Sequence, residues 1–167
     1  DAEVTVVVTS KSRAQEVENF GFEARCNASK EEMADLIADA DIGVGAGGIS
    51  LLERCCLGLP TIVLSIAENQ RAGSKAAFQA GACQYLGLAR EVPSEKISES
   101  IQNLLNDPVL IKEMSTAASR ISDGLGAARI AAAHTYNTTH DKSAPVMLRR
   151  VVQEDSQLLY DWQKHPE

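Results

Sequence analysis

The stretch Asp41-Ile-Gly-Val-Gly-Ala-Gly-Gly-Ile-Ser-Leu-Leu-Glu53 decides the fold class of this chain. Residues 41–45 combine apolar side chains with glycine and predict a strand, and residues 49–57 predict a helix. A strand that passes through glycines into a helix is typical of the carboxyl edge of a parallel sheet. α/β proteins bind their ligands at that edge. The stretch therefore predicts both a fold class and a place for a site.

The glycines of this stretch suggest an anion site. Gly45, Gly47 and Gly48 carry no Cβ, so a ligand could approach the backbone there. The unpaired N–H groups at the start of the following helix favour an anion such as a diphosphate, and Ser50 could add a hydroxyl donor. The spacing is neither that of the Rossmann fingerprint nor that of a P-loop. Glycines that only form a tight turn explain the pattern equally well.

Strands and helices alternate on both sides of this stretch. Apolar runs predict strands at 4–9, 22–26, 60–64 and 83–86, and amphipathic runs predict helices at 30–40 and 70–80. Ser29 and Glu32 have the spacing of a capping box. The alternation predicts an α/β fold with a Rossmann-like parallel sheet flanked by helices.

The chain becomes helical after Gly87. Amphipathic helices are expected from Ser94 and from Asp107 through Ile121, and an alanine-rich helix at 127–133. We expect the α/β domain and its closing helices to span residues 1–135, followed by a polar linker at 136–145. Residues 146–167 would be the start of another domain or a plain C-terminal helix.

Composition narrows the function classes. The 167 residues hold 16 Lys and Arg against 23 Asp and Glu, a formal charge of −7 that disfavours a nucleic-acid partner. No apolar run approaches the roughly 20 residues of a membrane span. Four cysteines without metal-site spacing suggest reduced thiols in the cytoplasm. No carboxylate pair stands beside the glycines, so neither a metal nor a cofactor is expected. Because the chain begins with Asp1, we expect it to be a piece of a longer protein.

Polar residues at two predicted βα junctions are the candidate ligand contacts. Glu53, one turn into its helix, could accept two hydrogen bonds from a ribose diol, although the helix dipole alone also favours a glutamate there. Asn69 and Gln70 could bind sugar hydroxyls, with a helix N-cap as the alternative role of Asn69. None of the three histidines falls at a predicted junction, so they are poor candidates for a catalytic base: His134, His140 and His165.

The segment from Ala40 to Pro60, followed by Ala67-Glu-Asn-Gln70, closely resembles the C-terminal half of the nucleotide-sugar hydrolases of pseudaminic acid biosynthesis. These enzymes release UDP from a 2,4-diacetamido-2,4,6-trideoxy hexose and are similar to the UDP-N-acetylglucosamine transferase that makes the peptidoglycan lipid intermediate. The resemblance covers residues 4–133. It implies a GT-B fold, in which two Rossmann-like halves hold the nucleotide mainly through the C-terminal one.

The resemblance also implies roles for individual residues. By position, a diphosphate-binding turn corresponds to Gly47, Gly48 and Ser50, a ribose-binding glutamate to Glu53, and a sugar-facing pair to Asn69 and Gln70. Ser50 and Leu52 stand where family members usually have Thr and Trp. The family's catalytic histidine belongs to an N-terminal half outside this chain, and the first βα unit of the C-terminal half is also expected before Asp1. No catalytic residue is therefore expected here.

Three functions follow as expectations. The first is the UDP-sugar-binding half of a nucleotide-sugar hydrolase, with the remaining half of the same polypeptide as its partner. A glycosyltransferase that uses a UDP-sugar donor and a non-catalytic binding module are the alternatives. The chain alone would bind weakly without turnover, and a domain face exposed by truncation would favour a homodimer. The tail from Met147 to Glu167 resembles the opening strand and helix of GCN5-type N-acetyltransferases.

Overall fold

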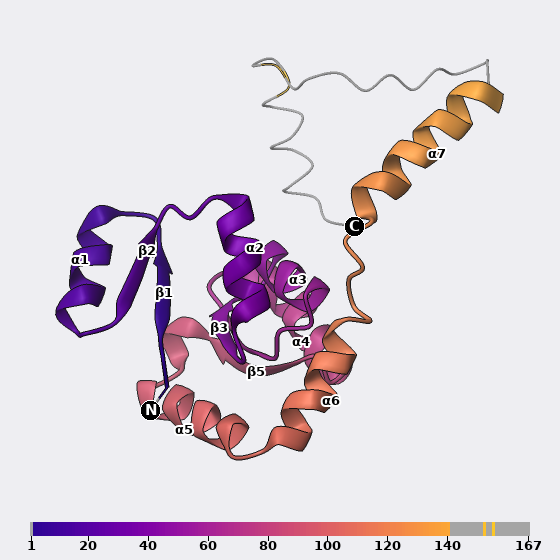
Figure 1. Cartoon of the computed structure of the whole chain (residues 1–167). Coiled ribbons are helices and arrows are strands. Elements are labelled where there is room, and N and C mark those ends of the chain that lie inside the picture. Colours follow the sequence, from indigo (N-terminus) through magenta and orange to yellow (C-terminus); the bar gives the residue numbers. More distant parts are fainter. Residues whose placement is uncertain (1, 141–151, 153–154, 156–167) are drawn as a thin grey trace. The chain divides into compact units, whose positions relative to one another are not determined.

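The computed structural model describes residues 2–140, 152 and 155 (Figure 1). The chain divides into two compact units, Asp1–Gly124 and Leu125–Glu167. The described part of the second unit is essentially one helix, α7 (Gly126–His140). The candidate site lies wholly within the first unit.

Strands and helices alternate through the first unit as far as β5. The first half contains β1 (Thr5–Val8), α1 (Lys11–Asn19), β2 (Glu23–Cys26), α2 (Lys30–Asp39), β3 (Gly43–Ala46) and α3 (Ile49–Cys56). The second half contains β4 (Thr61–Ser65), the 3₁₀ turn η1 (Glu68–Gln70), α4 (Arg71–Gln79), β5 (Cys83–Leu88), the 3₁₀ turn η2 (Ala89–Glu91), α5 (Ser94–Leu105) and α6 (Pro108–Ala118). No helix among these described elements is both long and apolar enough to cross a membrane.

All strand pairs are parallel and form two sheets. In one sheet β1 pairs with β2, and in the other β4 lies between β3 and β5. Every residue of β4 is buried. Ile62 packs on one face with Leu104 and Met114, while Val63 packs on the other with Leu51 and Ala77. Helices therefore cover both faces of β4, as is usual for parallel sheets.

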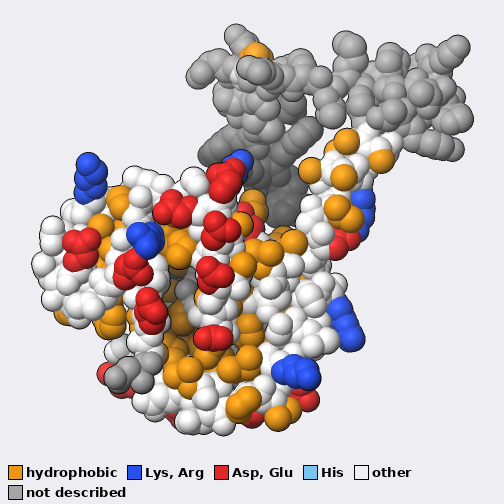
Figure 2. All heavy atoms as spheres, in the orientation of Figure 1, with side chains coloured by type: hydrophobic (Ala, Val, Ile, Leu, Met, Phe, Trp, Pro, Cys, Tyr) orange, Lys and Arg blue, Asp and Glu red, His pale blue; other side chains and the backbone are white. Residues whose placement is uncertain are grey.

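The strands β1 and β3 each keep one edge that pairs with no other described strand. Apolar residues are correspondingly exposed: Val7 of β1 is 40% and Val44 of β3 46% accessible, and Val4, just before β1, is 42% accessible. Figure 2 shows hydrophobic side chains gathered in a hollow of this face, next to the acidic residues over α2. A doubly wound sheet is normally continuous, so this opening between β1 and β3 is the main departure from the expected sheet.

Most of the expected elements are present within a residue or two of their predicted ends. The capping box is confirmed, because Ser29 Oγ accepts from Glu32 N at 3.1 Å and the Glu32 carboxylate accepts from Ser29 N at 3.2 Å. The pattern did not predict α1, none of whose residues is buried. Residues 136–140, which were expected to begin the polar linker, continue the helix α7. The remaining linker and the acetyltransferase-like tail lie outside the described residues, apart from positions 152 and 155.

All four cysteines are free thiols, as expected. Burial raises the pKa of the Cys83 thiol to about 12, and the neighbouring Cys55 thiol adds to the shift. A thiol with that pKa is almost entirely protonated at pH 8, and the thiolate is the nucleophile.

We therefore expect Cys83 to resist iodoacetamide in the native protein at pH 8 and to react only after denaturation. The half-buried Cys56 should react in the native state. Mass spectrometry of the labelled peptides measures both rates. Equal native-state rates at Cys56 and Cys83 would contradict the described core.

Hydrogen exchange should separate the two sheets. A two-stranded sheet with half-exposed side chains is stabilised by few buried contacts, whereas β4 is enclosed on both faces. We expect amides of 5–8 and 23–26 to exchange at least about tenfold faster than those of 61–65 when followed by mass spectrometry. Equal protection would show that both sheets open as one unit.

Candidate functional site

The site is built where β3 runs into α3. Gly48 forms the turn with φ of 77° and is the N-cap of α3, where no side chain caps the helix. The first N–H groups of a helix have no acceptor within the helix, so this end presents free donors. Ser50 lies exposed in the first turn. These features agree with the anion site expected from the sequence.

Gly47 has a different role from the one expected. Its N–H donates to the Leu64 carbonyl at 3.2 Å, so this donor belongs to the β3–β4 ladder and is not free for a ligand. A Cβ on Gly47 would overlap Ser74 Oγ and lie 3.3 Å from Gln70 Cβ. Gly47 is therefore glycine because side chains from η1 and α4 occupy the space beside it.

A pocket of about 630 Å³ opens between α2 and α3, next to this turn. Met33 and Ile37 of α2 and Ile49 and Leu52 of α3 form apolar walls, and Glu53 supplies a carboxylate. Glu53 is exposed, one turn into α3 as predicted. The pocket thus joins an apolar surface to a hydrogen-bond acceptor beside the uncapped start of α3.

The second junction places Asn69 and Gln70 in η1, after β4. The N-cap alternative for Asn69 is wrong, because Gln70 precedes α4 and neither η1 nor α4 has a side-chain cap; Asn69 is exposed. Gln70 Oε1 accepts from Ile66 N at 3.0 Å. Gln70 Nε2 is 3.5 Å from the position of a Cβ on Gly48, so the amide lies against the turn. The structure therefore brings both junctions together.

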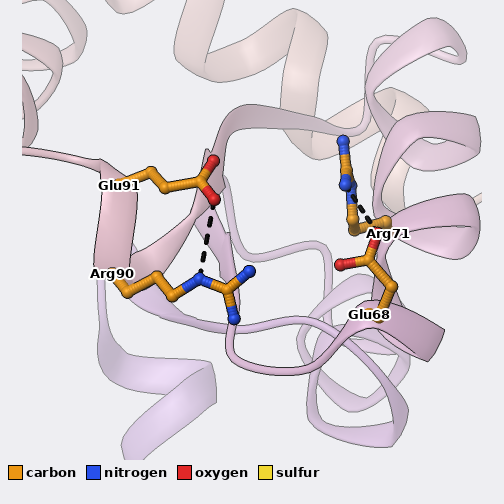
Figure 3. A network of polar contacts seen from close by, with 4 residues as sticks. All are labelled: Glu68, Arg71, Arg90 and Glu91. Atoms are coloured by element: carbon orange, nitrogen blue, oxygen red, sulfur yellow. Dashed lines mark hydrogen bonds and ion pairs between the residues drawn. The ribbon is translucent and has the colours of Figure 1, made fainter.

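Charged residues are paired at this junction, in η1 and Arg71, and also in η2, the turn after β5. Arg71 Nη1 lies 2.6 Å from Glu68 Oε1, and Arg90 Nε lies 3.5 Å from Glu91 Oε1 (Figure 3). The hydrogen bond and charge of Glu68 raise the pKa of Arg71. Exposed pairs of this kind contribute little to stability. Their effect here is that Glu68 presents no uncompensated negative charge beside Asn69.

Three residues of the site were not identified from the sequence. Arg54 Nη2 donates to the Ala46 carbonyl at 2.5 Å, and the buried Ser74 donates to the Gln70 carbonyl at 2.9 Å. Ser65 Oγ lies 3.4 Å from Ser74 Oγ. The only sequence signal was spacing, since Ser74 follows Gln70 by one helical turn. Within the described part of the chain, no group of three His, Cys, Asp or Glu side chains could hold a metal.

The family model of the glycosyltransferase family 28 C-terminal domain matches residues 3–130. The chain belongs to this family. The family 28 domain thus includes both junctions and the pocket between α2 and α3.

Similar proteins agree with this assignment. The family 28 domain is 36% identical over 101 residues to the spore coat polysaccharide biosynthesis protein SpsG of Bacillus subtilis, covering 60% of this chain and 30% of that protein. It is 32% identical over 95 residues to a UDP-N-acetylglucosamine–N-acetylmuramyl-(pentapeptide) pyrophosphoryl-undecaprenol N-acetylglucosamine transferase of Caldicellulosiruptor saccharolyticus, covering 54% and 25%. The chain therefore spans less than a third of either relative.

A solved structure gives the same fold. MurG of Acinetobacter baumannii superposes with a TM-score of 0.61 at 14% identity, over 80% of this chain and 41% of that one. At this identity the likeness concerns the fold alone, and it confirms the expected α/β architecture with parallel sheets. The preference for a hydrolase finds no support among these proteins, which favour the glycosyltransferase alternative.

The role found for Gly47 can be tested by substitution. We expect Gly47→Ala to lower the free energy of unfolding by about 1–3 kcal/mol, because its Cβ would overlap Ser74 Oγ. Adding Ser74→Ala should recover part of that loss. Urea denaturation measures each change.

Gly73→Ala is the matched control, since nothing lies within 4 Å of a Cβ there and the residue is inside α4. It should stabilise the domain by about 0.5–1 kcal/mol. If both alanines had the same effect on unfolding, the described packing of Gly47 would be wrong.

Proposed function

We propose that this family 28 domain binds a UDP-sugar as the donor-binding part of a glycosyltransferase. The observation that carries the proposal is the arrangement of Glu53 in an apolar pocket directly beside the uncapped start of α3. A nucleoside diphosphate has the matching chemistry: a flat ring, a diol and an anion in that order.

The pocket suits the nucleoside. Its volume of about 630 Å³ is within the range of small-molecule sites, and its walls offer apolar surface to a base. Glu53 would accept hydrogen bonds from the ribose hydroxyls. Because Ile49 lines the pocket and follows Gly48, the diphosphate of such a nucleotide would reach the turn.

The α3 N-terminus suits the diphosphate. Its first N–H groups and the helix dipole favour negative charge, and Ser50 adds a hydroxyl. These donors would also stabilise the charge that develops on UDP as it leaves the sugar. Gly47 supplies no donor, since its N–H is already bonded to the Leu64 carbonyl. Its missing Cβ instead lets η1 lie close to the turn.

The second junction suits the sugar. Gln70 Nε2 lies against Gly48, at the end of the diphosphate path, and Asn69 is exposed beside it in η1. The remainder of a longer polypeptide would supply the acceptor site and the catalytic base, and the reaction would take place in the cytoplasm. None of the described histidines is assigned to catalysis.

Titration calorimetry with UDP, UMP, CMP and NAD tests the proposal. We expect UDP to bind preferentially, and Glu53→Ala to weaken its binding by about 1–3 kcal/mol because a ribose acceptor is lost. Glu31→Ala, an exposed carboxylate in the first turn of α2, should leave the affinity unchanged. Absence of UDP binding by the folded intact protein would overturn the proposal.

A second assay separates the reaction types. UDP release by the intact protein should depend on an added sugar or lipid acceptor if the domain serves a transferase. Release with water alone would favour the hydrolase, and binding without any release would favour a non-catalytic module.

A further inference from the structure

The side chain of Arg54 lies along β3, on the strand that leads into the candidate diphosphate turn. Arg54 follows Glu53 on α3, but while Glu53 is exposed at the pocket, Arg54 is half-buried. Its Nη2 donates to the carbonyl of Ala46, the last residue of β3. The next two residues, Gly47 and Gly48, form the turn.

Gly45 makes room for the guanidinium of this side chain, because a Cβ on Gly45 would lie 2.9 Å from Arg54 Nη1. A Cβ on Gly43 would lie 2.9 Å from Leu59 Cδ2 and 3.3 Å from Arg54 Cδ, so Gly43 leaves space for both side chains. The alternate residues of a strand share one face, so both glycines face α3. The space beside Gly45, which the sequence suggested to be open to a ligand, is instead filled by the Arg54 guanidinium.

This arrangement costs stability. Arg54 Nε is buried without a hydrogen-bond partner. In the described part of the chain no carboxylate forms an ion pair with Arg54, whereas Arg25, Arg71 and Arg90 each have one. Burial lowers the pKa of the guanidinium, with a partial opposing effect from Cys55 and Glu53, yet an arginine stays charged at neutral pH.

Packing against β3 alone would not require an arginine at position 54. Methionine or leucine would fill the space over Gly43 and Gly45 without desolvating a charge. Glycine also weakens a strand interior, so the sequence gives up further stability at Gly45 to hold the guanidinium there. The feature that the guanidinium touches is the end of β3, immediately before the turn.

We infer that Arg54 is a positioning residue that fixes the Ala46 carbonyl, and with it the Gly48 turn, so that the first N–H groups of α3 face the diphosphate. This inference rests on the proposed function. The guanidinium also places a positive charge beneath the bound anion. Arg54 acts through the backbone and does not touch the ligand.

The test compares UDP with uridine in the intact protein. Uridine lacks the diphosphate but keeps the base and diol that would occupy the pocket with Glu53. We expect Arg54→Met to weaken the binding of UDP about 10- to 100-fold and that of uridine less than about twofold. Calorimetry gives the UDP affinity, and ligand-observed NMR gives that of uridine.

Three further variants complete the experiment. Arg54→Lys keeps the charge and should recover part of the UDP affinity. Gly45→Ala keeps Arg54 but displaces its guanidinium, so it should also weaken the binding of UDP more than that of uridine. If Arg54→Met does not fold, Gly45→Ala tests the role of Arg54 in its place. Arg13→Met removes the same charge from α1 and should change neither affinity.

The results distinguish the inference about Arg54 from the proposed binding of a UDP-sugar. If Arg54→Met or Gly45→Ala changes the affinities of UDP and uridine by the same factor, or changes neither, Arg54 only packs and the inference is overturned. If the unmodified protein binds neither ligand, the proposed function fails first and the inference fails with it.

Discussion

Burial of β4 on both faces is the constraint on which the rest of the first unit depends. Successive side chains of a strand point to opposite faces, so Ile62 and Val63 each require a separate apolar cluster. Helices α3 and α4, with Ala118 of α6, supply one cluster, and α5 with Met114 of α6 supplies the other. Because β4 also pairs with both β3 and β5, its burial fixes the edge at which the loops after these strands meet.

The loops at that edge are held by contacts between successive βα units. The turn after β3 is packed against side chains that follow β4: Gln70 accepts from Ile66 N, and Ser74 binds the Gln70 carbonyl. This network keeps the α3 N-terminus open while filling the space beside Gly47. A rigid turn with free donors is what an anion site requires, because donors already in place need no reorganisation when the ligand binds.

Family membership and site geometry agree at the level of donor binding. The glycosyltransferase family 28 C-terminal domain matches most of the chain, and the apolar pocket with Glu53 lies within the matched residues. Under the proposed function, the acceptor site and the catalytic base would come from residues outside this domain. The domain itself would then select the nucleotide, and those other residues would select the reaction.

Local sequence patterns predict the order of strands and helices after residue 22 and the capping box at Ser29, and they indicate where the candidate site lies. These depend on apolar periodicity and on contacts within one helical turn, which a local pattern records. The patterns did not predict α1, where no side chain is buried, or the helical residues 136–140.

Tertiary structure alone decided the functions of the individual glycines. Gly45 accommodates Arg54 from the following helix, Gly47 accommodates Ser74 from the helix after that, and Gly48 alone forms the open turn. In the sequence the three positions look alike because each simply lacks a Cβ. The atoms that fill the missing space come from residues 9 to 27 positions away, and only the packing of helices on the sheet brings them there.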